Sequence, residues 1–276
     1  MSTGKEARLR RLIDPESGTS LMFAFSHGTS TPEVLSGTER PFDMISAVVS
    51  GGAQCVFVAP GLARVTTDAL ANHPSTGFVV KVTATASRAS ALHQEVMTSS
   101  IERAVCLGAD GVVALLPFAP ENEPDVIRIA SEIGESCDRW GVPFIAEAEF
   151  PNAYFGDADY ATEWGLPYLR RSARLCVELG ADIIKSNWTG SAESFAEIVG
   201  CVPVPVVVAG GSRDSDEALL RKVLEARSVG AIGCSVGRNL FQHDDPASMA
   251  RALVTILRQR SDPKEVLLAN GLVVAS

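Results

Sequence analysis

Short apolar runs alternate with polar or glycine-containing breaks along most of the chain. Eight of these runs are four to six residues long, a length typical of buried strands. They lie at residues 21–25, 55–58, 78–82, 111–116, 143–148, 182–185, 204–209 and 231–236. Between them, apolar residues at helical spacing predict helices, for example over residues 126–140, 168–179 and 217–228. Successive strand ends lie roughly 24–37 residues apart, the size of one βα unit, so we predict an α/β protein with a single-domain (β/α)8 TIM barrel.

Glycine marks several points where a predicted helix gives way to a strand. A Gly-Ala pair precedes the second, fourth, sixth and eighth strands, and glycine suits the position just after a helix. The main alternative is a doubly wound open sheet, but no GxGxxG or Walker pattern follows the first strand. We therefore expect the barrel over residues 20–262, an N-terminal extension or helix over 1–19, and a C-terminal tail over 263–276.

Composition restricts the partners and the location of this chain. Its 276 residues carry a net charge of −9, which argues against broad binding to nucleic acid or to anionic membranes. No apolar run approaches the ~20 residues of a membrane span, and residues 1–12 lack a signal-peptide pattern. The six cysteines show no CxxC spacing, so free thiols in a reducing cytoplasm are expected. Four histidines without paired spacing argue against a metal site, and we expect no cofactor.

Polar side chains gather at the carboxyl ends of the predicted strands, where barrel enzymes assemble their chemistry. Lys185 stands near the end of the sixth strand, where its apolar neighbours predict another Val or Ile. A lysine in a strand-built interior has two common uses, a structural ion pair or an amine nucleophile that forms a Schiff base with a carbonyl. Because side chains alternate along a strand, Asn187 shares the face of Lys185, and Glu147 shares the face of Glu149.

The charges near Lys185 decide between these two uses. A second cation and desolvation would lower the pKa of Lys185 and yield the neutral amine that attacks carbonyls. Nearby carboxylates act in the opposite direction, and Glu147 or Glu149 could form a salt bridge with Lys81 or Lys185. The sequence leaves both alternatives open.

Glycine-containing loops follow the seventh and eighth strands. Gly210, Gly211 and Ser212 follow the first of these, and Gly237 and Arg238 follow the second. Barrels often bind phosphate with these two loops, through backbone amides that point at the anion, and Arg238 could add a charged contact. The alternative is two tight turns that happen to contain glycine. Because both loops carry glycine, we favour a phosphate site.

Three stretches carry a resemblance to a known family: Gly-Ala-Asp-Ile-Ile-Lys-Ser-Asn-Trp-Thr-Gly at 180–190, Pro-Val-Val-Val-Ala-Gly-Gly at 205–211 and Val-Gly-Arg-Asn-Leu-Phe-Gln at 236–242. The chain resembles the archaeal-type class I fructose-bisphosphate aldolases and their wider group, which includes aminodideoxyheptulosonate synthase and the autoinducer-2 aldolase relatives. The resemblance implies a TIM barrel, Lys185 as Schiff-base lysine, and a substrate phosphate at 210–212 and 237–238. It also implies a homo-oligomeric ring of five or ten subunits. We expect Lys81 and Asn187 to contact the substrate.

Two positions depart from that family. It shows Asp-His-Gly after the first strand, where this chain has Ser26-His27-Gly28. At the end of the fifth strand the family has a tyrosine before a proline. Counting without a gap places Glu149 at the tyrosine position, whereas aligning on the proline places Phe150 there. We favour Glu149, because a carboxyl with a raised pKa can transfer protons as the tyrosine does.

Other side chains are further candidates for proton transfer. Glu147 or His27 could assist Glu149, and Ser26 stands where the family has its active-site aspartate. His27 fits equally well as a structural histidine. Tyr154 and Tyr160, in the long loop after the fifth strand, could supply a phenol, with a solvated connection as the alternative.

Together these features predict a Schiff-base-forming (class I) aldolase or related aldol-type transferase. It would make or break a C–C bond in a phosphorylated ketose or a dihydroxyacetone-phosphate-like substrate, in specialised biosynthesis. One alternative is a non-covalent sugar-phosphate isomerase or lyase on the same barrel. Another is a catalytically inactive homologue that binds a phosphate ligand.

Overall fold

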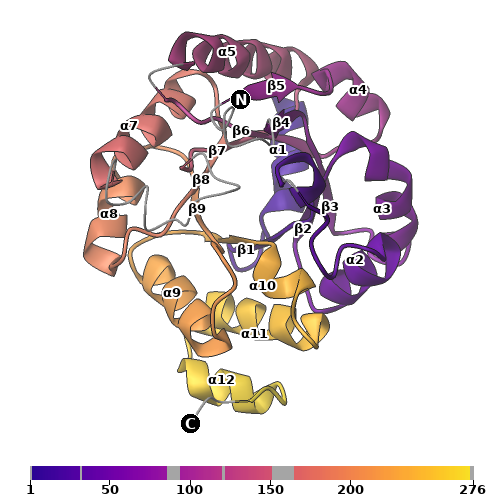
Figure 1. The fold of residues 1–276 in the computed structure, drawn as a ribbon, viewed down its shortest axis with the longest axis vertical. Coiled ribbons are helices and arrows are strands. Elements are labelled where there is room, and N and C mark those ends of the chain that lie inside the picture. The colour runs from indigo at the N-terminus through magenta and orange to yellow at the C-terminus, as the bar shows by residue number, and fades with distance from the viewer. Residues whose placement is uncertain (1, 32, 86–93, 120–121, 151–164, 274–276) are drawn as a thin grey trace.

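Eight parallel strands close into a barrel, with helices outside it (Figure 1). The computed structural model describes residues 2–31, 33–85, 94–119, 122–150 and 165–273. Around the barrel the strands follow the order β1-β10-β9-β8-β7-β6-β3-β2. Their bounds are β1 Ser20–Ala24, β2 Cys55–Val58, β3 Gly77–Lys81, β6 Gly111–Leu115, β7 Phe144–Glu147, β8 Ile183–Ser186, β9 Val206–Ala209 and β10 Gly233–Val236. Each lies within or overlaps one predicted apolar run, and the TIM-barrel prediction is confirmed.

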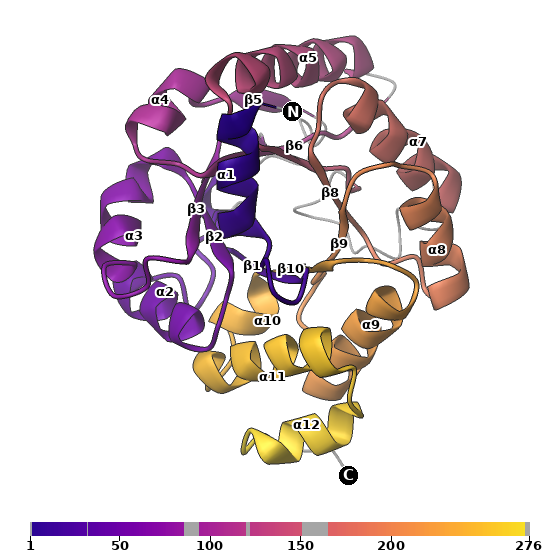
Figure 2. The ribbon, with the colours of Figure 1, turned by 180° about the vertical axis from the view of Figure 1, so that it is seen from behind.

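Most of the helices surround the barrel in the order of the chain, whereas the first and the last lie elsewhere (Figures 1 and 2). The helices are α1 Thr3–Leu12, α2 Pro41–Ser50, α3 Ala63–Ala69, α4 Ile101–Cys106, α5 Glu123–Trp140, α7 Gly165–Glu178, α8 Ala192–Gly200, α9 Asp216–Ser228, α10 Arg238–Phe241, α11 Pro246–Gln259 and α12 Pro263–Ala269, with short 3-10 turns η1 His27–Thr29 and η2 Pro60–Leu62. Residues 263–276, expected as a tail, include α12, which packs against α9 and α11 outside the helix ring (Figures 1 and 2). No helix in the described ranges has the length and apolar character that crossing a bilayer requires.

Helix α1 closes the amino end of the barrel, as the rear view shows (Figure 2). Its Leu12 is fully buried among inward-facing strand residues such as Met22 and Phe57. Lys5 fixes the helix through ion pairs of 2.6 Å to Asp138 on α5 and 2.9 Å to Asp182 before β8. The barrel interior is therefore packed at this end, and its polar cavity lies at the opposite, carboxyl end of the strands.

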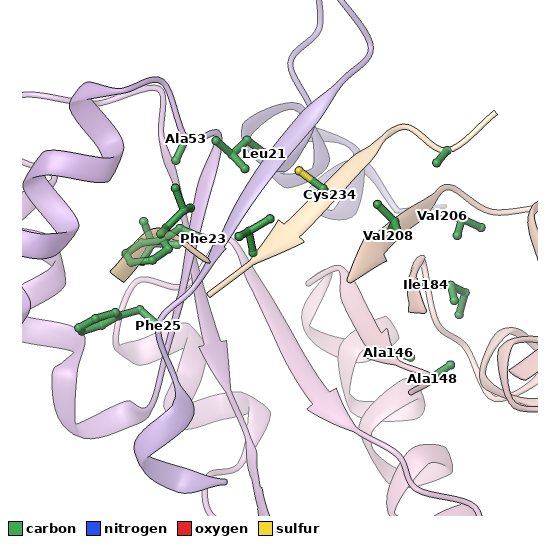
Figure 3. Close-up of a cluster of buried hydrophobic side chains, with 14 of the residues drawn as sticks. Leu21, Phe23, Phe25, Ala53, Ala146, Ala148, Ile184, Val206, Val208 and Cys234 are labelled. Carbon is green, nitrogen blue, oxygen red and sulfur yellow. The ribbon is translucent and has the colours of Figure 1, made fainter. Parts of the chain in front are cut away.

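Alternation along each strand separates two buried layers. Outward-facing side chains form the layer between strands and helices, and Figure 3 shows Phe23, Val208, Ile184 and Ala146 among them. The inward-facing positions between them are apolar near α1 and become polar toward the carboxyl ends of the strands. This change of character along one face of the strands creates the site described below.

A two-stranded antiparallel hairpin after β3 is an addition to the predicted elements. It pairs β4 (Thr83–Thr85) with β5 (Glu95–Met97). Both strands are only three residues long, and Val96 and Met97 of β5 are exposed. The hairpin therefore shows no alternating apolar pattern in the sequence. The Thr85 hydroxyl donates to the buried Glu95 carboxylate at 2.8 Å, which ties the two strands together.

Candidate active site

A cavity of about 100 Å³, partly open to solvent, lies at the carboxyl ends of the barrel strands. Most of the side chains and glycines that the sequence marks as candidates line it: Ser26, His27, Lys81, Glu147, Glu149, Lys185, Asn187, Gly210, Gly211, Gly237 and Arg238. The exception is Ser212, which is exposed and lies outside the cavity lining. Residues from strands far apart in sequence thus converge on one space, as expected for the catalytic end of a barrel.

Four charged side chains form an alternating chain on one wall of the cavity. The Lys185 ammonium lies 2.7 Å from a Glu147 oxygen and 3.0 Å from a Glu149 oxygen. The second Glu147 oxygen lies 3.3 Å from the ammonium of Lys81, which also donates to the Ser30 hydroxyl at 2.9 Å. Lys81, Glu147 and Lys185 are all buried. Two cations and two anions balance one another, which is what permits this much charge in the barrel interior.

The carboxylates determine the charge of Lys185. Burial alone would lower the pKa of Lys185, but Glu147 and Glu149 outweigh it and hold the pKa above its ordinary value. Burial alone would also raise the pKa of Glu147, yet Lys185 and Lys81 bring it down to about 2. Of the two alternatives that the sequence leaves open, the resting site shows the salt bridge, with a charged Lys185. Lys81 contacts the same Glu147 carboxylate.

The end of β7 bears on the choice between Glu149 and Phe150 for the position of the family tyrosine. Glu149 points into the cavity and contacts Lys185, whereas the Phe150 ring stacks on Tyr168 with ring centres 5.6 Å apart. Asn187 fixes this turn, because its side-chain oxygen accepts a 2.8 Å hydrogen bond from the Phe150 amide. Of Glu149 and Phe150, Glu149 is therefore the residue whose side chain can transfer protons in this cavity. Tyr154 and Tyr160 lie outside the described residues.

His27 packs against the loop that follows β10. Its ring meets the Phe241 ring edge-on at 4.9 Å, and a Cβ on Gly237 would lie 2.2 Å from the His27 ring, so only glycine fits there. Burial, together with Lys185, Arg238 and Lys81, lowers the pKa of His27 to about 3. The imidazole is therefore neutral near pH 7. A neutral ring still offers one donor and one acceptor.

Replacing His27 with phenylalanine is expected to make the fold less sensitive to mild acid. The unfolded imidazole takes up a proton near pH 6.5 and the folded one only near pH 3. The unfolded chain therefore binds more protons in between, and stability is lost as the pH falls from 6.5 toward 3. Urea unfolding at about pH 7 and about pH 5 measures this loss, which should be smaller in the variant. Glu95, whose pKa burial raises to about 7, acts in the opposite direction in both proteins and cancels in the comparison. An equal loss in both would contradict the assignment.

The loops after β9 and β10 form the opposite wall and are tied together. The Asn239 side chain donates to the Ser212 carbonyl at 2.9 Å and accepts from the Asp214 amide at 2.8 Å. Lys222 donates to the Gly210 carbonyl at 2.9 Å. Arg238 lines the cavity, and its Nε is buried without a partner in the described part of the chain. This wall is thus rigid and carries a cation, whereas the wall of Lys185 is balanced in charge.

Three polar residues of the cavity lining were not predicted as site residues from the sequence: Ser30, Thr31 and Ser235. Ser235 carries the same signal that reveals Lys185, a polar residue at an inward position of an otherwise apolar strand. Ser30 and Thr31 follow η1 in an irregular segment, where no periodicity indicates which side chains face the cavity. Among the described residues, no group of three or more His, Cys, Asp or Glu side chains is arranged to hold a metal ion.

Comparison with known proteins identifies the family to which these features belong. The sequence profile described as DeoC/LacD family aldolase matches residues 19–243, from the start of β1 to just beyond α10. The chain belongs to the DeoC/LacD aldolase family. The match covers every strand of the barrel, and the resemblance stated from the sequence is confirmed.

Individual relatives of this DeoC/LacD aldolase agree with that assignment. The chain is 32% identical over 275 residues to 2-amino-3,7-dideoxy-D-threo-hept-6-ulosonate synthase of Halobacterium salinarum, covering 98% of both proteins. It is 36% identical over 183 residues to 2-amino-4,5-dihydroxy-6-oxo-7-(phosphonooxy)heptanoate synthase of Streptomyces griseus, covering 66% of this chain and 65% of the relative. A solved Schiff-base-forming fructose-1,6-bisphosphate aldolase is 25% identical with a TM-score of 0.76, covering 92% of this chain and 100% of that one. The protein is an aldolase-type enzyme of the Schiff-base class.

Proposed function

We propose that this DeoC/LacD aldolase makes or breaks a C–C bond in a phosphorylated ketose or dihydroxyacetone-phosphate-like substrate through a Schiff base on Lys185. The observation that carries the proposal is the placement of Lys185. It is a buried amine at the base of the cavity, in contact with two carboxylates, and the same cavity is lined by Gly210, Gly237 and Arg238. One end of a substrate can meet the amine while an anionic end meets the glycine loops.

Schiff-base formation requires Lys185 to lose a proton. Glu149 suits this step, because its carboxylate lies 3.0 Å from the ammonium and is more exposed than that of Glu147. The neutral amine then adds to the ketone carbon, and the carbinolamine oxygen leaves as water with two of the original ammonium protons. Glu149 returns the proton it took, so it is ionised again when the protonated imine has formed.

Cleavage uses the imine as an acceptor of electrons. The electron pair of the breaking C–C bond moves toward the imine and forms an enamine, while the hydroxyl of the departing carbon gives its proton to Glu149 and becomes an aldehyde. Return of a proton to the enamine carbon regenerates the imine. Hydrolysis of the imine then releases the ketone and restores Lys185. Synthesis runs the same steps in reverse. Glu147, with a pKa of about 2, stays ionised throughout and stabilises each cationic form of Lys185.

The phosphate at the glycine loops is supported by the part of the cavity wall that follows β9 and β10. Arg238 has a buried Nε without a partner among the described residues, and the Gly210–Gly211 and Gly237 backbones line the cavity beside it. The Streptomyces relative is named for a compound with a ketone at carbon 6, a phosphonooxy group at carbon 7 and hydroxyls at carbons 4 and 5. That compound is a β-hydroxy ketone with a phosphate next to the ketone, the pattern that this arrangement of amine and loops would accept.

A second candidate is a non-covalent sugar-phosphate isomerase or lyase. The ion pairs of Lys185 favour it, since an ammonium held by two carboxylates is also what a purely structural lysine shows. A catalytically inactive phosphate-binding homologue would look the same at rest. Neither alternative forms a covalent adduct. A homo-oligomeric ring of five or ten subunits and a cytoplasmic location stay predictions, the first of which analytical ultracentrifugation would check.

Borohydride reduction in the presence of dihydroxyacetone phosphate tests the proposal. The imine should be trapped as a secondary amine, and the intact protein should gain the mass of the ketone less one oxygen atom. Dihydroxyacetone without phosphate should give the same kind of adduct only at a concentration about 10- to 100-fold higher, because charge-assisted contacts to the phosphate are lost. No adduct with any phosphorylated ketone would favour the non-covalent or inactive alternatives.

A further inference from the structure

Ser235 presents a buried hydroxyl that none of these steps uses. It is 1% exposed, faces the cavity from β10, and its Oγ has no hydrogen-bond partner among the residues that the structure describes. A hydroxyl buried without a partner carries an uncompensated desolvation cost. A hydroxyl kept in a catalytic cavity at such a cost points to a ligand atom that satisfies it.

His27 presents a second atom of this kind from the neighbouring strand end. Its Nδ1 is buried and has no partner within the described ranges, and the ring lines the same cavity. His27 follows β1, which pairs with β10, and its ring packs against Gly237, two residues after Ser235. The neutral imidazole and the hydroxyl each donate one hydrogen bond and accept another. Two uncharged groups of this type match a hydroxyl on the ligand, which also donates and accepts.

The wall around Ser235 leaves room for substrate carbons. Ala209 on β9 lies opposite Ser235 in the strand register, and Ala24 stands at the end of β1. Both line the cavity, so three small side chains form this wall while Lys81, Glu147 and Lys185 form the other. A ketone bound covalently to Lys185 would therefore present its neighbouring carbons to the wall of Ser235.

The position of Ser235 separates it from the phosphate loops. Gly237 and Arg238 lie beyond the last residue of β10, Val236, in the segment that begins α10. A phosphate would take its charged contacts from that segment. Ser235 lies within β10 and presents an uncharged hydroxyl to the same cavity.

We propose that Ser235 and His27 hold a hydroxyl group on the carbon next to the ketone that Lys185 attacks, so that the site selects hydroxyketones over deoxyketones. This inference rests on the proposed function, because it assumes that the ketone reacts with Lys185. The two contacts make the hydroxyl part of the recognised substrate. They also fix the orientation of the carbon that becomes the nucleophile in C–C bond formation.

The test compares dihydroxyacetone phosphate with hydroxyacetone phosphate, which lacks that hydroxyl. For each ketone, the apparent dissociation constant comes from the fraction of intact protein trapped by borohydride across a concentration series. The wild type should prefer dihydroxyacetone phosphate, and Ser235→Ala should reduce this preference about three- to tenfold, the usual effect of one neutral hydrogen bond. Adduct formation with hydroxyacetone phosphate should change less in Ser235→Ala than adduct formation with dihydroxyacetone phosphate, because only the latter carries the hydroxyl that Ser235 contacts. Ser235→Cys keeps a side chain of the same shape, slightly larger, and should reduce the preference as well, since a thiol is a weak hydrogen-bond donor.

Ser186→Ala is the matched control. Ser186 is also fully buried, with an Oγ that has no partner among the described residues, but it lies on the outward face of β8 together with Ile184. Its replacement should leave the preference of the wild type intact. Combining Ser235→Ala with His27→Phe should change the preference by less than the product of the two single effects, because both residues contact one hydroxyl.

The outcomes separate the two proposals. Adducts with both ketones and an unchanged preference in Ser235→Ala and Ser235→Cys would overturn the hydroxyl subsite and leave the Schiff-base proposal standing. An equal change in Ser186→Ala would also overturn it, since the effect would then come from general loosening of the barrel. Failure of the wild type to form an adduct with either ketone would refute the proposed function and, with it, the subsite.

Discussion

Replacing Lys185 with arginine is expected to reduce turnover by a factor of about 10⁴ or more, because the variant has no amine that can form an imine. Arginine keeps a cation beside Glu147 and Glu149, so the charge balance of the buried cluster is preserved and the fold should persist. Steady-state cleavage of a phosphorylated ketose measures the effect, with circular dichroism as a check on folding.

Lys81→Arg is the matched control for this prediction. Lys81 is the other buried lysine of the cavity and also contacts Glu147, at 3.3 Å where Lys185 lies at 2.7 Å. Its replacement should cost much less turnover, and the borohydride-trapped adduct should still form. Loss of the adduct in Lys81→Arg, together with its survival in Lys185→Arg, would reassign the nucleophile to Lys81.

Replacing Glu147 with glutamine is expected to lower the free energy of unfolding by about 3–5 kcal/mol, the usual cost of removing one member of a buried ion pair. Glu147 bridges Lys81 and Lys185, so its loss removes the carboxylate that pairs with both buried ammonium groups. The pKa of Lys185 should fall in this variant, because its largest favourable partner has gone. Urea unfolding near pH 7 measures the stability, and the pH dependence of adduct formation reports on the amine.

Low pH provides an internal check on the Glu147 prediction. The pKa of Glu147 is about 2 in the fold against an ordinary value of 4.5, so its stabilising contribution is complete above about pH 4.5 and is lost as the pH falls toward 2. The stability difference between wild type and Glu147→Gln should therefore shrink in that range. Asp138→Asn is the control, since it removes a mostly exposed carboxylate from another buried lysine, Lys5, and should cost at most about 1 kcal/mol. Equal effects of both substitutions would contradict the account.

The pattern of apolar residues along the chain predicted most of the barrel architecture. Apolar runs such as 111–116 and 204–209 are short, continuous and separated by helical patterns, because strands buried on both faces need apolar residues at every position. The same logic exposed Lys185, since a charged residue interrupts one of these runs. The hairpin β4–β5 escaped prediction because it is held by Thr85 and Glu95 and by backbone pairing, with little apolar burial to leave a pattern.

The sequence predicted which residues line the site better than it predicted their charge states. Alternation identified Glu147 and Glu149 as neighbours on one face, and both line the cavity. Whether Lys185 is neutral or charged depends on small differences in the distances between side chains of β7 and β8. The spacing of residues in the sequence does not give these distances. The neutral state of His27 has the same origin, because its surroundings come from β10 and from charges on β3 and β8.

Peptide mapping of the borohydride-reduced adduct tests the central claim most directly. The wild-type protein, reduced with dihydroxyacetone phosphate and digested, should carry the added three-carbon phosphate on the peptide that contains Lys185, with tandem mass spectra locating it on that side chain. Modification of the Lys81 peptide instead, or of no cavity lysine, would contradict the claim that Lys185 is the Schiff-base residue of this barrel.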